Sequence, residues 1–220
     1  MSETLFVQLL DLACGALLLT AVLMLWRREL AVIIRMFALQ GVALAALVAV
    51  LAAHEGAGEL WAVAVGLLVL RAGVLPYLVR RALASAGEAR RETRPLVNVS
   101  ASLLAAAVLT LLAYATSRPL VELAPSPVTA AIPVGVTVTL IGFFLLVTRR
   151  RALSQLVGFL LMDNGITAIG FLTTSGVGLI VELGVSLDVL LAVLALQILT
   201  TRMRETFGGT DLDELRELHD

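Results

Sequence analysis

LVGFLLMDNGITAIGFL at residues 156–172 and VELGVSLDVLLAVLALQIL at residues 181–199 each place an aspartate inside a long apolar run. These aspartates are Asp163 and Asp188. A charged side chain near the centre of a bilayer costs at least about 2.5–3.5 kcal/mol, so it persists mainly where a protonic or ionic task needs it. The two stretches therefore indicate membrane-spanning helices of a protein that handles protons.

The composition of the whole chain agrees with a membrane protein. Apolar residues make up 60% and charged residues 15%, and the mean hydropathy is +0.99, whereas soluble domains carry about 25% charged residues. One membrane-spanning helix needs about 20 apolar residues. The 220 residues thus predict an all-α polytopic protein with seven transmembrane helices: Thr4–Trp26, Leu30–Ala53, Leu60–Val79, Leu96–Thr116, Ala130–Thr148, Ala152–Thr173 and Val177–Thr200.

The positive residues predict the orientation in the membrane. All 16 are arginines, and cytoplasmic loops carry the excess of positive charge. With the N-terminus outside, only Arg118 lies in an external loop, and Arg35 and Arg71 lie within spans. The other arginines then face the cytoplasm, which predicts a multi-pass membrane protein with a cytoplasmic C-terminus. We expect the membrane to be the inner membrane of a prokaryotic cell.

The loops and a weak internal sequence repeat predict two units of three helices each. LMLWRRELAVIIRMFALQG at 23–41 and FFLLVTRRRALSQLVGFLLMDNG at 143–165 each join an apolar span to a tight arginine turn, and repeats are common in transport folds. We expect an N-terminal unit at 1–95, a connecting helix and external loop at 96–127, a second unit at 128–203, and a cytoplasmic tail at 204–220.

Helix rise gives the depth of the buried charges. At 1.5 Å per residue, Asp163 lies roughly 18 Å inward of Arg151, Asp188 roughly 21 Å inward of Arg202, and Arg71 roughly 14 Å inward of Arg80. A lone carboxyl at such depth tends to be protonated, whereas a nearby arginine favours the carboxylate. This competition can leave an acid able to load and release a proton.

Other polar residues in the spans extend the candidate proton-transfer set. Asn164 follows one acid directly, and Glu182 precedes the other. Arg71 is open to three interpretations, as a mobile charge partner, a fixed counter-ion or a structural anchor. Arg35 and Gln40 are candidates for a further polar path. The alternative for the acids is an interhelical hydrogen bond that only holds helices together.

Redox, metal and catalytic chemistry have no residues to support them in this sequence. One Cys and two scattered His exclude a haem, iron–sulfur or nickel ligand set, and no phosphate-binding glycine loop or nucleic-acid motif is present. We expect no catalytic residues, no metal and no cofactor in this chain.

The stretches TRRRALSQLVGFLLMDNG at 148–165, VELGVSLDV at 181–189 and TRMRETFGGTDLDELRELHD at 201–220 resemble hydrogenase-4 component E, a membrane subunit of formate hydrogenlyase-like group 4 hydrogenases. The last three spans are also similar to the NuoK subunit of complex I and to the C subunit of multisubunit cation/proton antiporters. The resemblance matches Asp163 and Asn164 to a Met-Glu-Asn triplet, and Glu182 and Asp188 to a second pair of acids.

The resemblance implies a non-catalytic membrane-arm subunit that contributes buried acids to proton or cation translocation. Its implied partners are antiporter-like membrane subunits and a hydrogenase-like or quinone-linked soluble arm, within the lipid bilayer and without nucleic acid. The resemblance implies a lysine at the position of Arg71. Arginine does not readily release its proton, which argues against Arg71 as a proton relay. The alternatives from other classes are a stand-alone secondary transporter and a purely structural scaffold subunit.

Overall fold

The computed structural model describes residues 1–85 and 97–174. Within these residues the backbone is helical and contains no β-strand. The elements are α1 (Glu3–Trp26), α2 (Leu30–Glu55), α3 (Gly58–Leu67), the π-helix η1 (Leu68–Val74), α4 (Leu75–Ser85), α5 (Val99–Leu123), α6 (Pro127–Ala130), α7 (Ile132–Thr148) and α8 (Ala152–Thr174). The all-α prediction is confirmed for this part of the chain.

Six of the seven predicted spans correspond to helices long and apolar enough to cross a membrane, with mean hydropathies between 1.6 and 2.4. The third span is continuous from Gly58 to Ala84 because α3, η1 and α4 follow one another without a break. The seventh predicted span, Val177–Thr200, lies outside the described residues.

The predicted end of the fourth span at Thr116 is wrong, because α5 continues to Leu123 through Pro119. Proline usually interrupts a helix by removing one hydrogen bond and crowding the preceding turn. Here Arg118 and Glu122 still meet at 3.5 Å across one helical turn. The first residues of the predicted external loop are therefore helical.

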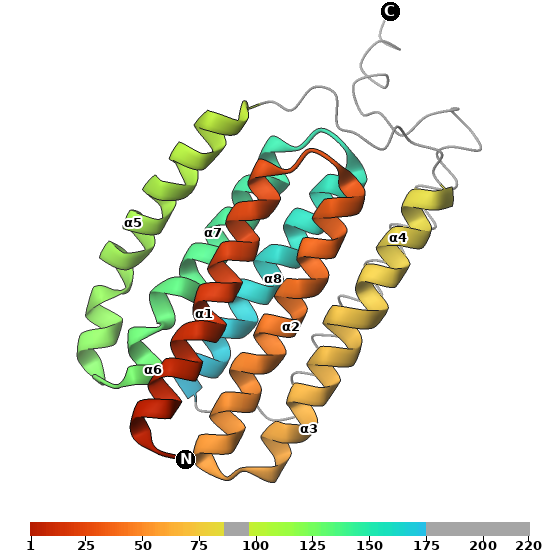
Figure 1. Ribbon diagram of the computed structural model, residues 1–220. Helices are drawn as coiled ribbons and strands as arrows, with labels where there is room; N and C mark the ends of the chain where they lie inside the picture. Colours follow the sequence, from red (N-terminus) through yellow and green to blue (C-terminus); the bar gives the residue numbers. More distant parts are fainter. Residues whose placement is uncertain (86–96, 175–220) are drawn as a thin grey trace, which may run out of the picture.

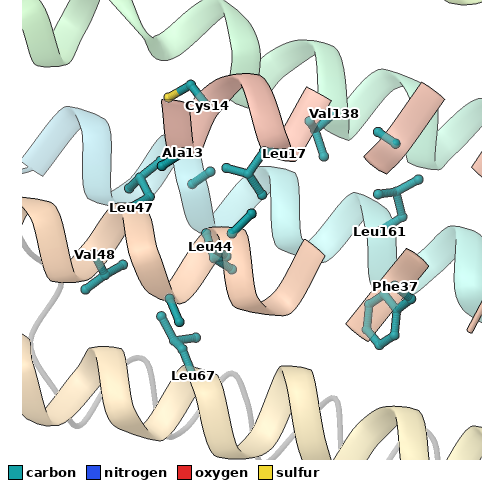
Figure 2. Close-up of a cluster of buried hydrophobic side chains, with 14 of the residues drawn as sticks. Ala13, Cys14, Leu17, Phe37, Leu44, Leu47, Val48, Leu67, Val138 and Leu161 are labelled. Carbon is teal, nitrogen blue, oxygen red and sulfur yellow. The ribbon is translucent and has the colours of Figure 1, made fainter. Parts of the chain in front are cut away.

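Four helices form the centre of the molecule. The hairpin of α1 and α2 lies beside the hairpin of α7 and α8, so that α1 contacts α7 and α2 contacts α8. The third span covers the outer side of α2, and α5 lies against α7 on the opposite flank (Figure 1). Figure 2 shows the apolar side chains that meet between these helices, each at most 2% exposed: Leu17, Leu44, Leu67, Val138 and Leu161.

Glycines allow α7 and α8 to pack with their backbones close together. A Cβ atom on Gly158 would lie 2.6 Å from the backbone nitrogen of Leu146, and one on Gly142 would overlap the backbone of Met162. Small residues at such contacts are the usual means by which helices associate in a bilayer, where no hydrophobic force drives them together. The contact fixes the height of α8 relative to α7.

The arginine turns of the two hairpins have the same backbone geometry. Each span ends at an extended arginine, Arg27 with φ −83° and ψ 142° and Arg149 with φ −89° and ψ 141°. Arg149 is 6% exposed, and its Nη2 donates to the carbonyl oxygens of Met24, Leu25 and Arg27 at 3.5, 3.4 and 3.3 Å. A cation thus neutralises the carbonyl end of α1 and ties the two turns together.

Candidate functional site

A buried guanidinium group is the centre of the candidate site. Arg71 lies on η1 and is 1% exposed. Its Nη1 donates to Asp163 Oδ2 and to Asn164 Oδ1, both at 2.5 Å, and its Nη2 donates to Thr167 Oγ1 at 2.9 Å. Charge-assisted bonds of this kind are about twice as strong as neutral ones.

The three acceptors come from one face of one helix. Asp163, Asn164 and Thr167 occupy positions i, i+1 and i+4 of α8, which places their side chains within one turn of each other. Their burial is nearly complete, with 8%, 0% and 7% of each residue exposed. The helix therefore presents a compact group of oxygens to a single arginine.

Both charged residues lie at the middle of their spans. Arg71 is equally far from the two ends of the span Gly58–Ala84, and Asp163 is equally far from the two ends of the span Leu153–Thr173. At 1.5 Å per residue the ends of the span are about 20 Å from Arg71 and about 15 Å from Asp163. If these helices cross a bilayer, the pair lies near the middle of its hydrocarbon core.

The backbone beneath Arg71 is wider than an α-helix. η1 covers Leu68–Val74, and such π-helical turns are rare and are concentrated at functional sites. Gly41 of α2 packs directly against it, because a Cβ on Gly41 would lie 2.6 Å from the carbonyl carbon of Arg71 and 2.8 Å from the nitrogen of Ala72. Only glycine permits this approach.

The two hairpins meet Arg71 through equivalent positions. Gly41 follows the turn residue Arg27 by the same number of residues as Asp163 follows Arg149. Gly41 contacts the backbone of Arg71, and Asp163 contacts its guanidinium group. The position that corresponds to Asp163 in the first hairpin is therefore Gly41, the residue after Gln40.

The structure separates the remaining predicted residues. Gln40 is fully buried and donates through Nε2 to the carbonyl oxygen of Leu17 at 3.4 Å, so it faces α1. Arg35 is exposed on α2. Asp188 and Glu182 lie outside the described residues. Of the predicted set, the structure thus brings together Arg71, Asp163 and Asn164.

Two residues of the site were missed in the sequence. Thr167 had a usable signal, because it lies one helical turn after Asp163. Gly41 had only the adjacent Gln40 to mark it, and glycine is common in this chain. Its contact with Arg71 depends on the relative height of two helices, which no local pattern records.

Arg71 and Asp163 form a buried ion pair with no net charge, and this limits the chemistry of the site. Arginine stays protonated in proteins, so Asp163 is the member that can exchange a proton. Its side chain is also the more accessible one, at 11% exposed against 2% for Arg71. No group of three or more metal-ligating side chains occurs among residues 1–85 and 97–174.

Comparison with known proteins gives one informative match. The chain is 49% identical over all 220 residues to a protein of Mycobacterium tuberculosis named Uncharacterized protein Rv0085, and the match covers the whole of both chains. The chain belongs to the Rv0085 family. No family model and no solved structure matches the chain. The alignment therefore includes all six described spans and also residues 175–220.

Proposed function

We propose that this protein is a membrane-arm subunit of a hydrogenase-like or complex I-like oxidoreductase complex, in which it contributes buried acids to proton or cation translocation. The observation that carries the proposal is the Arg71–Asp163 ion pair at the middle of two spans. The resemblance of residues 148–165 to hydrogenase-4 component E supports the type of complex.

Energetics favour a task for the ion pair beyond stability. Desolvating two charges is expensive, and a well-packed apolar pair of similar volume is often equally stable or more stable. A chain that needed only helix contacts could use the glycine packing already present between α7 and α8. A titratable group in the middle of a bundle supplies what apolar packing cannot, a site where a proton can rest halfway across the membrane.

Within the proposal, Asp163 holds the exchangeable proton, and Arg71 is its fixed counter-ion. Asn164 and Thr167 hold the guanidinium group when Asp163 is neutral, because both accept hydrogen bonds from it without carrying charge. The proposal also includes Asp188 and Glu182 in the proton path, because the sequence predicts them within the seventh span. The antiporter-like subunits and the hydrogenase-like or quinone-linked arm are its partners, with the N-terminus outside the cytoplasmic membrane.

A structural scaffold is the second candidate, because the bonds of Arg71 to three side chains of α8 also fasten the third span to the bundle. The two roles differ in what removal of the charge would do. A scaffold needs the contact itself, whereas a proton path needs the change of protonation.

The substitution Asp163→Asn tests the proposal, with Glu122→Gln as its control. Both remove one carboxylate, but Glu122 lies on the surface, where its side chain is 70% exposed. In membrane vesicles that contain the assembled complex, we expect Asp163→Asn to leave the amount of complex unchanged and to abolish proton uptake driven by electron transfer. Loss of assembly would instead support the scaffold. Proton transport by the isolated chain in proteoliposomes would support a stand-alone transporter.

A further inference from the structure

A second polar site lies at the end of the bundle that carries the arginine turns. A pocket of about 350 Å³ is lined by Trp26, Arg27, Arg28, Glu29, Val32 and Val99. These residues belong to the end of α1, the turn after it, the first turn of α2 and the start of α5. The three helix ends lie on one side of the molecule (Figure 1).

The position of the pocket is that of the membrane surface. Trp26 is the last residue of an apolar span and is 54% exposed, and tryptophan prefers the level of the lipid head groups. Val32 and Val99 contribute apolar side chains to the lining, and two arginines and one glutamate contribute charged ones. The pocket therefore spans the boundary between hydrocarbon and water.

The charge of the pocket suits an anion. Two guanidinium groups and one carboxylate leave one net positive charge. The Cζ atom of Arg27 lies 5.3 Å from the centroid of the Trp26 ring, an arrangement that attracts a cation to the ring face and limits its freedom. Guanidinium groups form paired hydrogen bonds with phosphate oxygens.

The backbone under the pocket is held firmly. The amide of Arg27 donates to the carbonyl oxygen of Leu23 at 3.1 Å, and its own carbonyl oxygen accepts from Arg149 Nη2 at 3.3 Å. The carbonyl oxygen of Glu29 accepts from Val32 and Ile33, each at 3.0 Å. A fixed backbone lowers the entropy lost when a ligand is bound.

We propose that this pocket binds the phosphate head group of an anionic glycerophospholipid, with the phosphate at Arg27 and Arg28 and the glycerol end beside Val32 and Val99. A membrane lipid fits better than free phosphate because half of the lining is apolar and Trp26 lies at the level of the head groups. Basic pockets between transmembrane helices on the cytoplasmic side are a known mode of recognition for anionic lipid head groups. The site is independent of the Arg71–Asp163 pair and of the function proposed for it.

The two tryptophans of the chain allow a direct test. In the variant Trp61→Phe, Trp26 is the only indole, and dibrominated lipids quench its fluorescence on contact. The full chain is placed in two kinds of mixed vesicle, one in which the phosphatidylglycerol is dibrominated and one in which the phosphatidylcholine is dibrominated. Quenching of Trp26 should be clearly stronger in the vesicles with dibrominated phosphatidylglycerol. Equal quenching by the two lipids would overturn the proposal.

Charge variants in the same background sharpen the test. Each basic residue near a membrane surface contributes about 1 kcal/mol toward an anionic lipid, so Arg27→Gln with Arg28→Gln should reduce the preference about thirtyfold. Glu29→Gln should raise it about fivefold. The single variant Arg28→Gln leaves the Trp26–Arg27 contact in place and should lose about fivefold. Arg118→Gln, at an exposed position of α5 outside the pocket, is the control and should change nothing.

Two further outcomes would count against a lipid site. An unchanged preference in the double arginine variant, with its helix content intact by circular dichroism, would place the selectivity elsewhere. Protection of Trp26 from brominated lipid by millimolar inorganic phosphate would show that the pocket selects free phosphate over a lipid head group.

Discussion

Replacing Gly41 by alanine adds one methyl group at the contact that positions Arg71. The new Cβ would lie 2.6 Å from the carbonyl carbon of Arg71, 2.7 Å from its oxygen and 2.8 Å from the nitrogen of Ala72. Ordinary contacts begin at 3.4 Å. Because all three neighbours are backbone atoms, the strain cannot be relieved by a side-chain rotation, so α2 and η1 must separate by about 0.8 Å in a close-packed interior.

The separation has two measurable effects. Overpacking of this kind costs about 1–3 kcal/mol of stability. If the guanidinium group moves with its backbone, its contact with Thr167 lengthens from 2.9 Å to about 3.7 Å, which is beyond hydrogen-bond range. We therefore expect Gly41→Ala to lower both the stability of the chain and the proton coupling proposed for Asp163.

Gly15→Ala is the matched control. Gly15 lies on α1, and a Cβ there would meet nothing within 4 Å, so this variant reports only the preference of helices for alanine over glycine, about 1 kcal/mol. Unfolding of both variants in detergent, followed by circular dichroism, should show Gly41→Ala less stable than Gly15→Ala. Equal stability and equal proton coupling in the two variants would refute the view that Gly41 positions Arg71.

Three further predictions follow from other contacts. Arg71→Met should destabilise the chain by about 3–5 kcal/mol, because it leaves Asp163 buried without its cation. The double variant Arg71→Met with Asp163→Leu should recover most of that loss. A double variant that is as unstable as Arg71→Met in detergent unfolding would contradict this. Arg149→Gln should lower the free energy of unfolding by about 1.5 kcal/mol through loss of its charged bonds to the carbonyl end of α1, and an unchanged unfolding midpoint would show that these bonds of 3.3–3.5 Å contribute nothing. The predicted orientation requires that Arg118→Cys, in a Cys14→Ala background, react with an impermeant maleimide added outside intact cells; reaction only after permeabilisation would reverse the topology.

Hydropathy was sufficient to predict where the described spans lie. The predicted start of the second span at Leu30 and the ends of the first and fifth spans at Trp26 and Thr148 agree with helices α1, α2 and α7. These boundaries are set locally, by an apolar run that meets a pair or triplet of arginines. The end of the fourth span was missed because the helix continues through Pro119, where the sequence suggested a turn.

The geometry of the candidate site depended on information that no single stretch contains. The sequence offered Arg71 as a partner for a buried acid, yet both Asp163 and Asp188 were available at similar depth. The structure selects Asp163 among the described residues through the packing of the third span and α8 around α2. The π-helical backbone at Leu68–Val74 was also invisible, because it differs from an α-helix by hydrogen-bond register and not by composition.

The separation of Arg71 and Asp163 along the chain, 92 residues, has a consequence for biogenesis. A ribosome delivers the third span to the membrane well before α8 has been synthesised, and an arginine at the centre of an inserted helix costs about 2.5–3.5 kcal/mol on translocon scales. The ion pair therefore forms only after α8 has been synthesised, and it joins two spans that leave the ribosome at different times.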